Sequence, residues 1–155
     1  MAKPFTSRWV GHSYDPLQDL GVFAFSLHPN LESVPESLLV KLSADNRYKL
    51  YVNGEMVAFG PQRGDVRHWF YDVVDLAPFL KVGKNEVLAL VWNFGYWAPM
   101  AQHTVRTGFF LESEAEGWNT PGDWQVARLD GWTFQMMHRD MGGFYIDVGP
   151  GEIVD

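Results

Sequence analysis

The strongest constraint on this chain is a side-chain alternation of period two that recurs in one short segment after another. In "RYKLYV" (47–52), Tyr48, Leu50 and Val52 fall on one face of an extended chain. The same alternation marks segments 21–28, 38–43, 55–59, 67–74, 85–93, 107–113 and 123–130. Alternation is typical of β-strands, whereas a helix repeats its apolar positions about every 3.6 residues. The sequence therefore predicts about seven or eight strands and no long helix.

Turn residues between these segments define how the strands connect. Asn53-Gly54 predicts a tight hairpin, because a type I′ turn needs positive φ at both central residues. "DLAPFLKVGKN" predicts one short helical turn, capped by Asp75 and closed at Gly83. No segment is long enough for the crossover helices of a parallel α/β sheet. The fold class we predict is all-β: an antiparallel β-sandwich or jelly roll.

Length and charge limit the domain count and the partners. The 155 residues fit a single β-sandwich domain, 1–155, which can bury one core without disulfides, and the chain has no cysteine. The net charge of −7 and the absence of a Lys/Arg cluster argue against nucleic acid and anionic membranes as partners. There is no apolar run of the roughly 18 residues that a membrane span needs. The start, "MAKPFTSRWVGH", lacks the apolar core of a signal peptide. We therefore expect a cytoplasmic protein or a domain excised from a longer chain, and the ending "GGFYIDVGPGEIVD" favours the latter.

Motifs for catalysis are missing from the sequence. It contains no G-x-S-x-G elbow, no P-loop, no H-E-x-x-H and no dinucleotide fingerprint. The five histidines are scattered without the spacing of metal ligands. Asp65, Asp72 and Asp75 do not identify a hydrolytic pair, and Asp75 is better explained as a helix cap. We expect no catalytic residue and no enzymatic activity in this chain alone.

An Asp-Asn pair separates two of the predicted strands and has two readings. Asp45 and Asn46 suit a corner in the chain, because both side chains bond local backbone and tolerate left-handed geometry. A carboxylate and an amide side by side could also bind vicinal sugar hydroxyls, or a calcium ion through their oxygens. A sugar site further needs rings that cover the apolar face of a pyranose. The candidate rings are Trp69, Trp92, Tyr96 and Trp97. Asn93, which closes a predicted strand, could reach the same rim or serve as an ordinary turn residue.

Three longer segments together resemble a known family. "SADNRYKLYVNGEMVAFGPQRGD", "HWFYDVVDLAPFLKVGKNEVLALVWNFG" and "RTGFFLE" are similar to the N-terminal β-sandwich domain of bacterial α-L-rhamnosidases of glycoside hydrolase family seventy-eight. The resemblance covers residues 42–111 and implies a galactose-binding-like jelly roll. In such enzymes the domain precedes an (α/α)6 catalytic barrel that hydrolyses with inversion on two acidic residues.

The resemblance also implies a site. Related modules bind a terminal L-rhamnose with help from calcium, and their contacts fall on Asp45, Asn46, Trp69 and Asn93 of this chain, with Asp45 and Asn46 as the calcium candidates. The expected function is a non-catalytic accessory domain that binds carbohydrate in rhamnose-containing glycans. The alternative is a structural domain that braces the catalytic domain of the parent chain and shapes its cleft. A third possibility, that the chain is itself a small hydrolase, has the least support.

Overall fold

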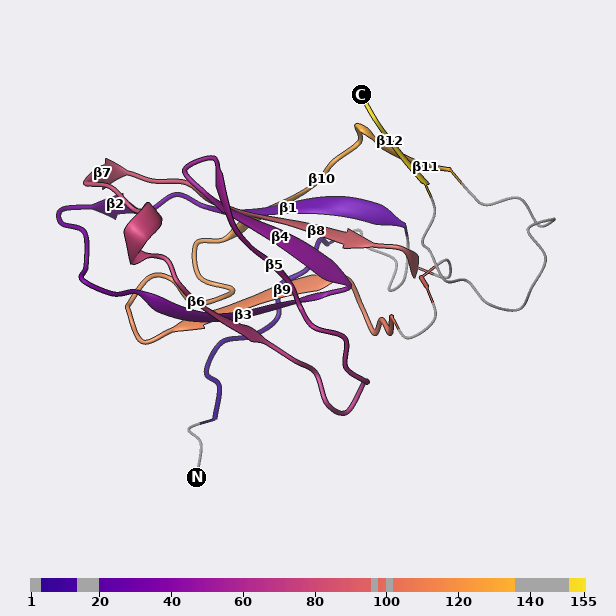
Figure 1. Ribbon diagram of the computed structural model, residues 1–155, viewed down its shortest axis with the longest axis horizontal. Helices are drawn as coiled ribbons and strands as arrows, with labels where there is room; N and C mark the ends of the chain where they lie inside the picture. Colours follow the sequence, from indigo (N-terminus) through magenta and orange to yellow (C-terminus); the bar gives the residue numbers. More distant parts are fainter. Residues whose placement is uncertain (1–3, 14–19, 96–97, 100–101, 136–150) are drawn as a thin grey trace.

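Two antiparallel sheets face each other across an apolar core (Figure 1). The structure, a computed structural model, describes residues 4–13, 20–95, 98–99, 102–135 and 151–155. The larger sheet has the strand order β10-β1-β8-β4-β5, and the smaller one has the order β6-β3-β9. Their bounds are β1 (Gly21–Leu27), β3 (Leu39–Asp45), β4 (Arg47–Val52), β5 (Glu55–Gly60), β6 (Asp72–Asp75), β8 (Val87–Asn93), β9 (Gly108–Ser113) and β10 (Gln125–Arg128). The predicted antiparallel β-sandwich is confirmed.

The remaining elements are short. Strands β2 (Asn30–Leu31) and β7 (Gly83–Lys84) form one small pair, and β11 (Trp132–Gln135) and β12 (Gly151–Val154) form another. The sequence did not predict these four strands, because two to four residues show too little alternation to be recognised. The predicted helical turn is the 3-10 helix η1 (Ala77–Phe79), and the Asp75 carboxylate accepts the Ala77 N–H at its start. In the part of the chain that the structure describes, no helix is long and apolar enough to cross a membrane.

Alternation places the core as expected. On β4, the side chains of Tyr48, Leu50 and Val52 are fully buried, and β8 alternates buried and half-buried positions along its whole length. The buried set that fills the space between the sheets includes Phe23, Phe25, Val40, Leu42, Val87, Ala89, Val91, Phe109 and Leu111. The Asn53-Gly54 hairpin has φ angles of 51° and 85°, so the predicted turn geometry is also confirmed.

The predicted strand 67–74 is wrong over its first half. Only Asp72–Asp75 pair with β3, and residues 67–71 form a loop. Asp65 explains the difference, because its Oδ1 accepts the backbone N–H groups of Arg67 and His68 at 2.7 and 3.0 Å. A side chain that bonds the backbone in this way offers an alternative to ladder pairing, so a turn replaces the start of the strand.

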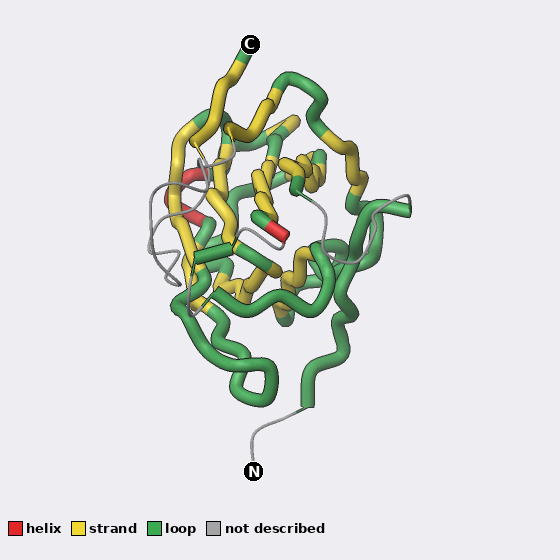
Figure 2. The backbone as a smooth tube through the Cα atoms, turned by 90° about the vertical axis from the view of Figure 1, so that its right-hand side faces the viewer, coloured by secondary structure: helices red, strands yellow, loops and turns green. Residues whose placement is uncertain are grey.

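The Asp-Asn corner is the point where the chain passes from one sheet to the other. β3 belongs to the small sheet and ends at Asp45, β4 belongs to the large sheet and begins at Arg47, and Asn46 alone connects them. The corner lies at the end of the sandwich opposite β2 and β7 (Figure 1). Figure 2 looks onto this end and shows loops crossing it.

Candidate functional site

Asp45 holds a distant loop against the corner. Its Oδ2 accepts the backbone N–H groups of Val105 and Arg106 at 2.7 and 2.8 Å, and the residue is only 2% exposed. Burial raises the pKa of the Asp45 carboxyl, and hydrogen bonds from the Thr104 side chain and the two backbone N–H groups only partly oppose this effect. The segment 103–107 is thus fastened to the corner by a buried acid.

The two asparagines fasten the same segment. The Nδ2 of Asn46 donates to the His103 carbonyl at 3.2 Å. The Nδ2 of Asn93, which is fully buried, donates to the hydroxyls of Thr104 and Thr107 at 2.9 and 3.0 Å, and its Oδ1 accepts the Gly95 N–H at 2.7 Å. The structure therefore brings Asp45, Asn46 and Asn93 together around one loop, and all the polar atoms of Asn93 are used inside the protein.

A large cavity opens beside this loop. Its volume is about 540 Å³, and its walls come from the N-terminal segment, the end of β3, the loop before β6 and the loop before β9. The residues around it are Trp9, Val10, Gly11, His12, Ser13, Asp45, Val66, Trp69, Val105, Arg106, Thr107 and Gly108. This volume lies within the range of roughly 300–1,000 Å³ that small-molecule sites occupy.

Two indoles form the apolar side of this cavity. The rings of Trp9 and Trp69 meet edge to face with their centroids 5.9 Å apart. Trp69 is fixed by a hydrogen bond from its Nε1 to the Ser43 hydroxyl at 3.1 Å. The segment that carries Trp9 is held by Glu112, whose Oε2 accepts the N–H groups of Thr6 and Ser7 at 2.7 and 2.8 Å. Aromatic faces in a cleft suit the apolar side of a sugar ring.

Asp45 also supplies the cavity with an acceptor. Its Oδ1 is buried and has no hydrogen-bond partner among the described residues. A buried acceptor without a partner is costly, so a ligand hydroxyl at this place would stabilise it. Of the four predicted residues, Asp45 and Trp69 line this cavity, whereas Asn46 lines a smaller neighbouring cavity and Asn93 lines neither.

Trp9 was not predicted as part of the site. The segment 4–13 has one isolated β-bridge, between Val10 and Phe109, and one bridging residue produces no alternation that the sequence could reveal. Of the other predicted rings, Trp92 is half-buried on β8 beneath Lys49, whose Nζ lies 5.8 Å from its ring centroid. Tyr96 and Trp97 lie outside the described residues.

The donor set for calcium is small. Asn46 Oδ1, like Asp45 Oδ1, is buried without a partner, but the two residues line different cavities. Calcium takes about six to eight oxygen ligands. In the described ranges no group of three His, Cys, Asp or Glu side chains is placed to hold a metal ion. The corner alone does not complete such a site, and calcium stays a prediction.

Fold and site together define a β-sandwich domain with a lateral cavity and, in its described residues, no metal cluster for chemistry. No protein-family model matches the sequence, and no curated protein does either. Among solved structures, a GH78 family rhamnosidase of Bacillus sp. GL1 is 26% identical with a TM-score of 0.73; the match covers 99% of this chain and 16% of that enzyme. The chain therefore resembles, over nearly its whole length, one domain of a GH78 rhamnosidase.

Two further rhamnosidases share the fold. An α-L-rhamnosidase of Streptomyces avermitilis, complexed with L-rhamnose, matches at 18% identity and a TM-score of 0.52. An α-L-rhamnosidase of Dictyoglumus thermophilum matches at 14% identity and a TM-score of 0.56. Each match covers 81% of this chain, and 12% and 16% of the respective enzyme. The chain thus spans only about a sixth of the rhamnosidases that it resembles.

Proposed function

We propose that this chain is a non-catalytic accessory domain, N-terminal in an α-L-rhamnosidase-like glycoside hydrolase, and that it binds L-rhamnose of a glycan in the large cavity. The observation that carries the proposal is the meeting of two crossed indoles with an unpartnered buried carboxylate oxygen in a cavity of sugar-binding size. The inverting hydrolysis itself would belong to the remainder of the parent enzyme.

Each predicted residue has a distinct part in this proposal. Trp69 and Trp9 cover the apolar face of the sugar, and Asp45 Oδ1 accepts one of its hydroxyls. Asn46 and Asn93 act indirectly, because they hold the segment 103–107 that forms one wall of the cavity. Asp45 and Asn46 are the residues that would hold a calcium ion through their side-chain oxygens, and the ion would supply positive charge for sugar hydroxyls.

Isothermal titration of the purified domain with L-rhamnose, with and without calcium, tests the proposal. We expect heat of binding at roughly millimolar sugar. Trp69→Ala should weaken binding at least about tenfold, because it removes the apolar platform. Trp132→Ala is the matched control, since Trp132 lies on β11 and does not line the cavity. Absence of heat in both conditions would refute rhamnose binding.

Exposed apolar side chains on the outer face of the small sheet support a structural role for the domain. Tyr71 and Phe5 pack edge to face with centroids 5.4 Å apart, the Lys41 Nζ lies 5.5 Å from the Phe5 ring, and Lys41 pairs with Val73 across the strands. Phe5, Tyr71 and Val73 are 45–58% exposed, as is typical of surfaces that another domain covers. As a second candidate function, we propose that this surface contacts the catalytic domain of the parent chain. Tyr71→Asp in the full-length enzyme should then lower its melting temperature while leaving rhamnose binding by the isolated domain unchanged. An unchanged melting temperature would exclude this contact.

A further inference from the structure

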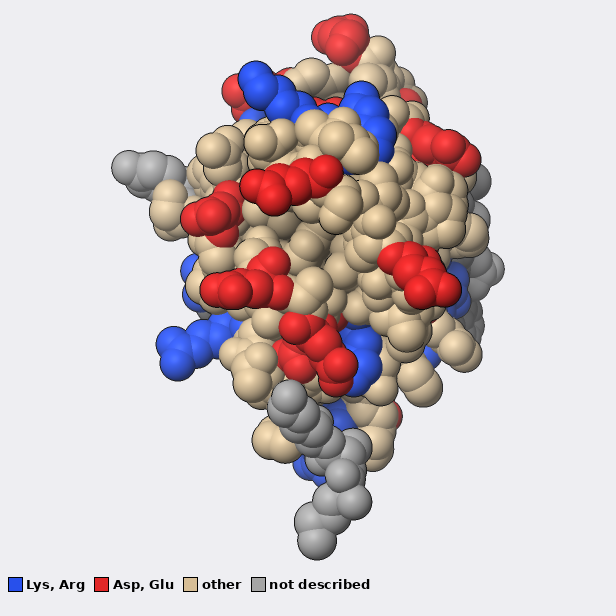
Figure 3. All heavy atoms as spheres, turned by 90° about the vertical axis from the view of Figure 1, so that its left-hand side faces the viewer, with Lys and Arg blue, Asp and Glu red and all other residues tan. Residues whose placement is uncertain are grey.

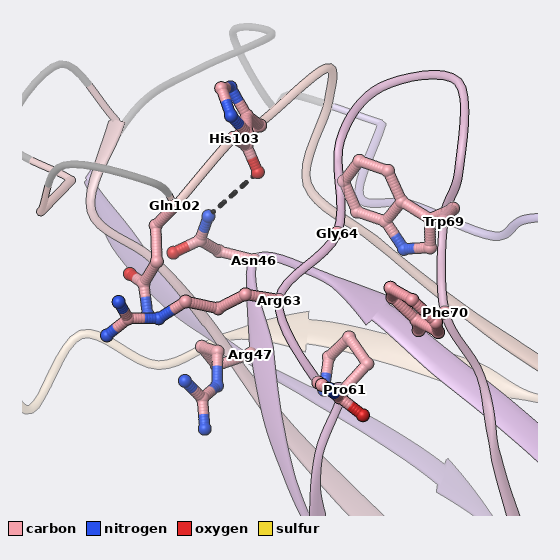
Figure 4. Close-up of a pocket in the computed structure, with 10 residues that line it drawn as sticks. Asn46, Arg47, Pro61, Arg63, Gly64, Trp69, Phe70, Gln102 and His103 are labelled. Atoms are coloured by element: carbon pink, nitrogen blue, oxygen red, sulfur yellow. Dashed lines mark hydrogen bonds between the residues drawn. The ribbon is translucent and has the colours of Figure 1, made fainter.

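A second, much smaller cavity lies on the other side of Trp69 (Figure 4). It is lined by Asn46, Arg47, Pro61, Gln62, Arg63, Gly64, Trp69, Phe70, Gln102 and His103. Its volume is about 30 Å³, whereas a single water needs roughly 10–15 Å³. A whole sugar ring does not fit, but a substituent of two or three heavy atoms does.

Two guanidinium groups border this cavity, and in the described part of the chain neither lies within ion-pair distance of a carboxylate. Figure 4 shows the Arg63 side chain extending toward Gln102, whereas the Arg47 side chain extends away from Asn46 and His103. The ion pair found among the described residues joins Asp65 and His68, so neither arginine is paired there. Burial, followed by repulsion from Arg63, lowers the pKa of Arg47, and attraction to Asp72 only partly opposes these effects. Since Arg stays protonated in proteins, the cavity presents positive charge that Asp72 offsets only in part.

Three side-chain atoms around the small cavity have no hydrogen-bond partner, and their chemistry indicates which ligand group would suit the cavity. The Nε of Arg47, the Oε1 of Gln102 and the Oδ1 of Asn46 are all buried without a partner in the described structure. Asn46 is 5% exposed, and its Nδ2 already donates to the His103 carbonyl, which leaves Oδ1 as an acceptor for the cavity. A donor flanked by acceptors matches a carboxylate that carries a hydroxyl nearby: the carboxylate takes the guanidinium N–H groups, and the hydroxyl donates to an amide oxygen.

The distribution of charge over the molecule also favours an anionic group in the small cavity. The chain carries a net charge of −7, and acidic side chains are spread over the β2–β7 end, which faces the viewer in Figure 3. Arg47, the first residue of β4, and Arg63, in the loop after β5, both line the small cavity beside the corner. The two arginines give this cavity a positive character that suits an anionic group.

We infer that this cavity is a binding site for the carboxylate of a uronic acid unit, so that the domain recognises an acidic glycan. The inference rests on the proposed carbohydrate-binding function, because Trp69 lines both cavities and would separate a sugar in the large one from the carboxylate in the small one. Arg47 and Arg63 bind the carboxylate inside the cavity while the sugar ring stays outside, and one hydroxyl next to the carboxylate donates to the amide oxygen of Asn46 or Gln102.

Titration of the nitrogen-15-labelled domain with D-glucuronate tests this inference, with D-glucose as the neutral match. The two sugars differ only at the carbon that bears the carboxylate. We expect the Arg47 Nε–H signal to shift and saturate with glucuronate and to stay in place with glucose. Charge-assisted hydrogen bonds predict a preference of roughly tenfold to hundredfold for glucuronate, which added salt should reduce.

A matched pair of arginines on one loop provides the control. Arg63→Gln should weaken glucuronate binding about tenfold or more, whereas Arg67→Gln should not, since Arg67 is also exposed on the same loop but does not line the cavity. Equal affinity for glucose and glucuronate, an equal response to sulfate, tighter binding of a glutamate-containing peptide, or an unchanged Arg63→Gln affinity would each overturn the inference.

The two readouts keep this test apart from that of the proposed function. L-Rhamnose is followed at the indole N–H signals of Trp9 and Trp69, and glucuronate is followed at Arg47. If the indole N–H signals do not shift with L-rhamnose but the Arg47 Nε–H signal shifts and saturates with glucuronate, rhamnose binding is refuted and the carboxylate site is retained. If the indole signals shift with L-rhamnose but the Arg47 signal does not shift with glucuronate, rhamnose binding is retained and the carboxylate site is refuted.

Discussion

Replacing Asp45 separates its structural hydrogen bonds from its charge. Asp45→Ala removes the acceptor of two buried backbone hydrogen bonds, at 2.7 and 2.8 Å, and so frees the segment 103–107. At a net worth of roughly 1–1.5 kcal/mol for each bond, we expect the free energy of unfolding to fall by about 2–3 kcal/mol. For a domain of this size, that loss lowers the melting temperature by roughly 5–10 °C.

Asp45→Asn should behave differently. The amide oxygen can accept the same two N–H groups, and the cost of burying a charge disappears. The pKa of Asp45 is raised in the folded state, so the contribution of Asp45 to stability is fully present below the ordinary carboxyl pKa and is lost as pH rises through the raised pKa. Asp45→Asn lacks this loss, and its advantage over the wild type should grow with pH across that window.

Urea unfolding, followed by tryptophan fluorescence at a series of pH values, measures both effects. The reasoning is refuted if Asp45→Ala unfolds with the wild-type midpoint, or if Asp45→Asn at neutral pH is as destabilised as Asp45→Ala. The affinities of the same variants for L-rhamnose would show whether Asp45 also contacts sugar. Oδ2 is occupied by the two backbone N–H groups, so Oδ1 is the oxygen that could accept a sugar hydroxyl.

Three further predictions concern stability. Asn93→Ala should cost about 2–4 kcal/mol, since it removes two buried hydrogen bonds and one partly buried hydrogen bond, and a melting temperature within 2 °C or so of the wild type would contradict this. Gly60→Ala should destabilise clearly, because its Cβ would lie 2.2 Å from Asp72 Oδ2, whereas Gly151→Ala, with its nearest contact at 3.5 Å, should be tolerated in the same thermal melt. The pKa of Asp75 is lowered by backbone hydrogen bonds, so its contribution to stability should vanish as pH falls below the ordinary carboxyl range; a wild-type acid unfolding profile for Asp75→Asn would argue against it.

The fold was largely predictable because its signals are local. Alternation around Leu50 placed β4 correctly, and Asn53-Gly54 placed its hairpin. The predicted strand 67–74 is wrong in its first half, because the Asp65 side chain competes with β-sheet pairing for a backbone N–H group there. Strands as short as β2 and β7 contain too few residues for their side-chain alternation to be detected in the sequence.

The candidate site was predictable only in part. Asp45 was singled out from residue type and position, Trp69 was singled out from four candidate rings by the family resemblance, and both line the large cavity. Trp9 and the arginines 47 and 63 were not, because they come from segments without periodicity or from unremarkable charged positions. Their roles depend on which neighbours remain unpartnered, and that is a property of the assembled sandwich.

The sequence by itself determined the strands, the hairpin and the corner at Asp45 and Asn46, because side-chain period and turn chemistry act between residues a few positions apart. Only the tertiary structure decided that Asp45 accepts a hydrogen bond from Val105, 60 positions further along the chain. It also decided that the adjacent residues Asp45 and Asn46 line different cavities. The physical reason is that a polar atom bonds whatever partner packing brings within about 3 Å, and sequence proximity does not set that partner.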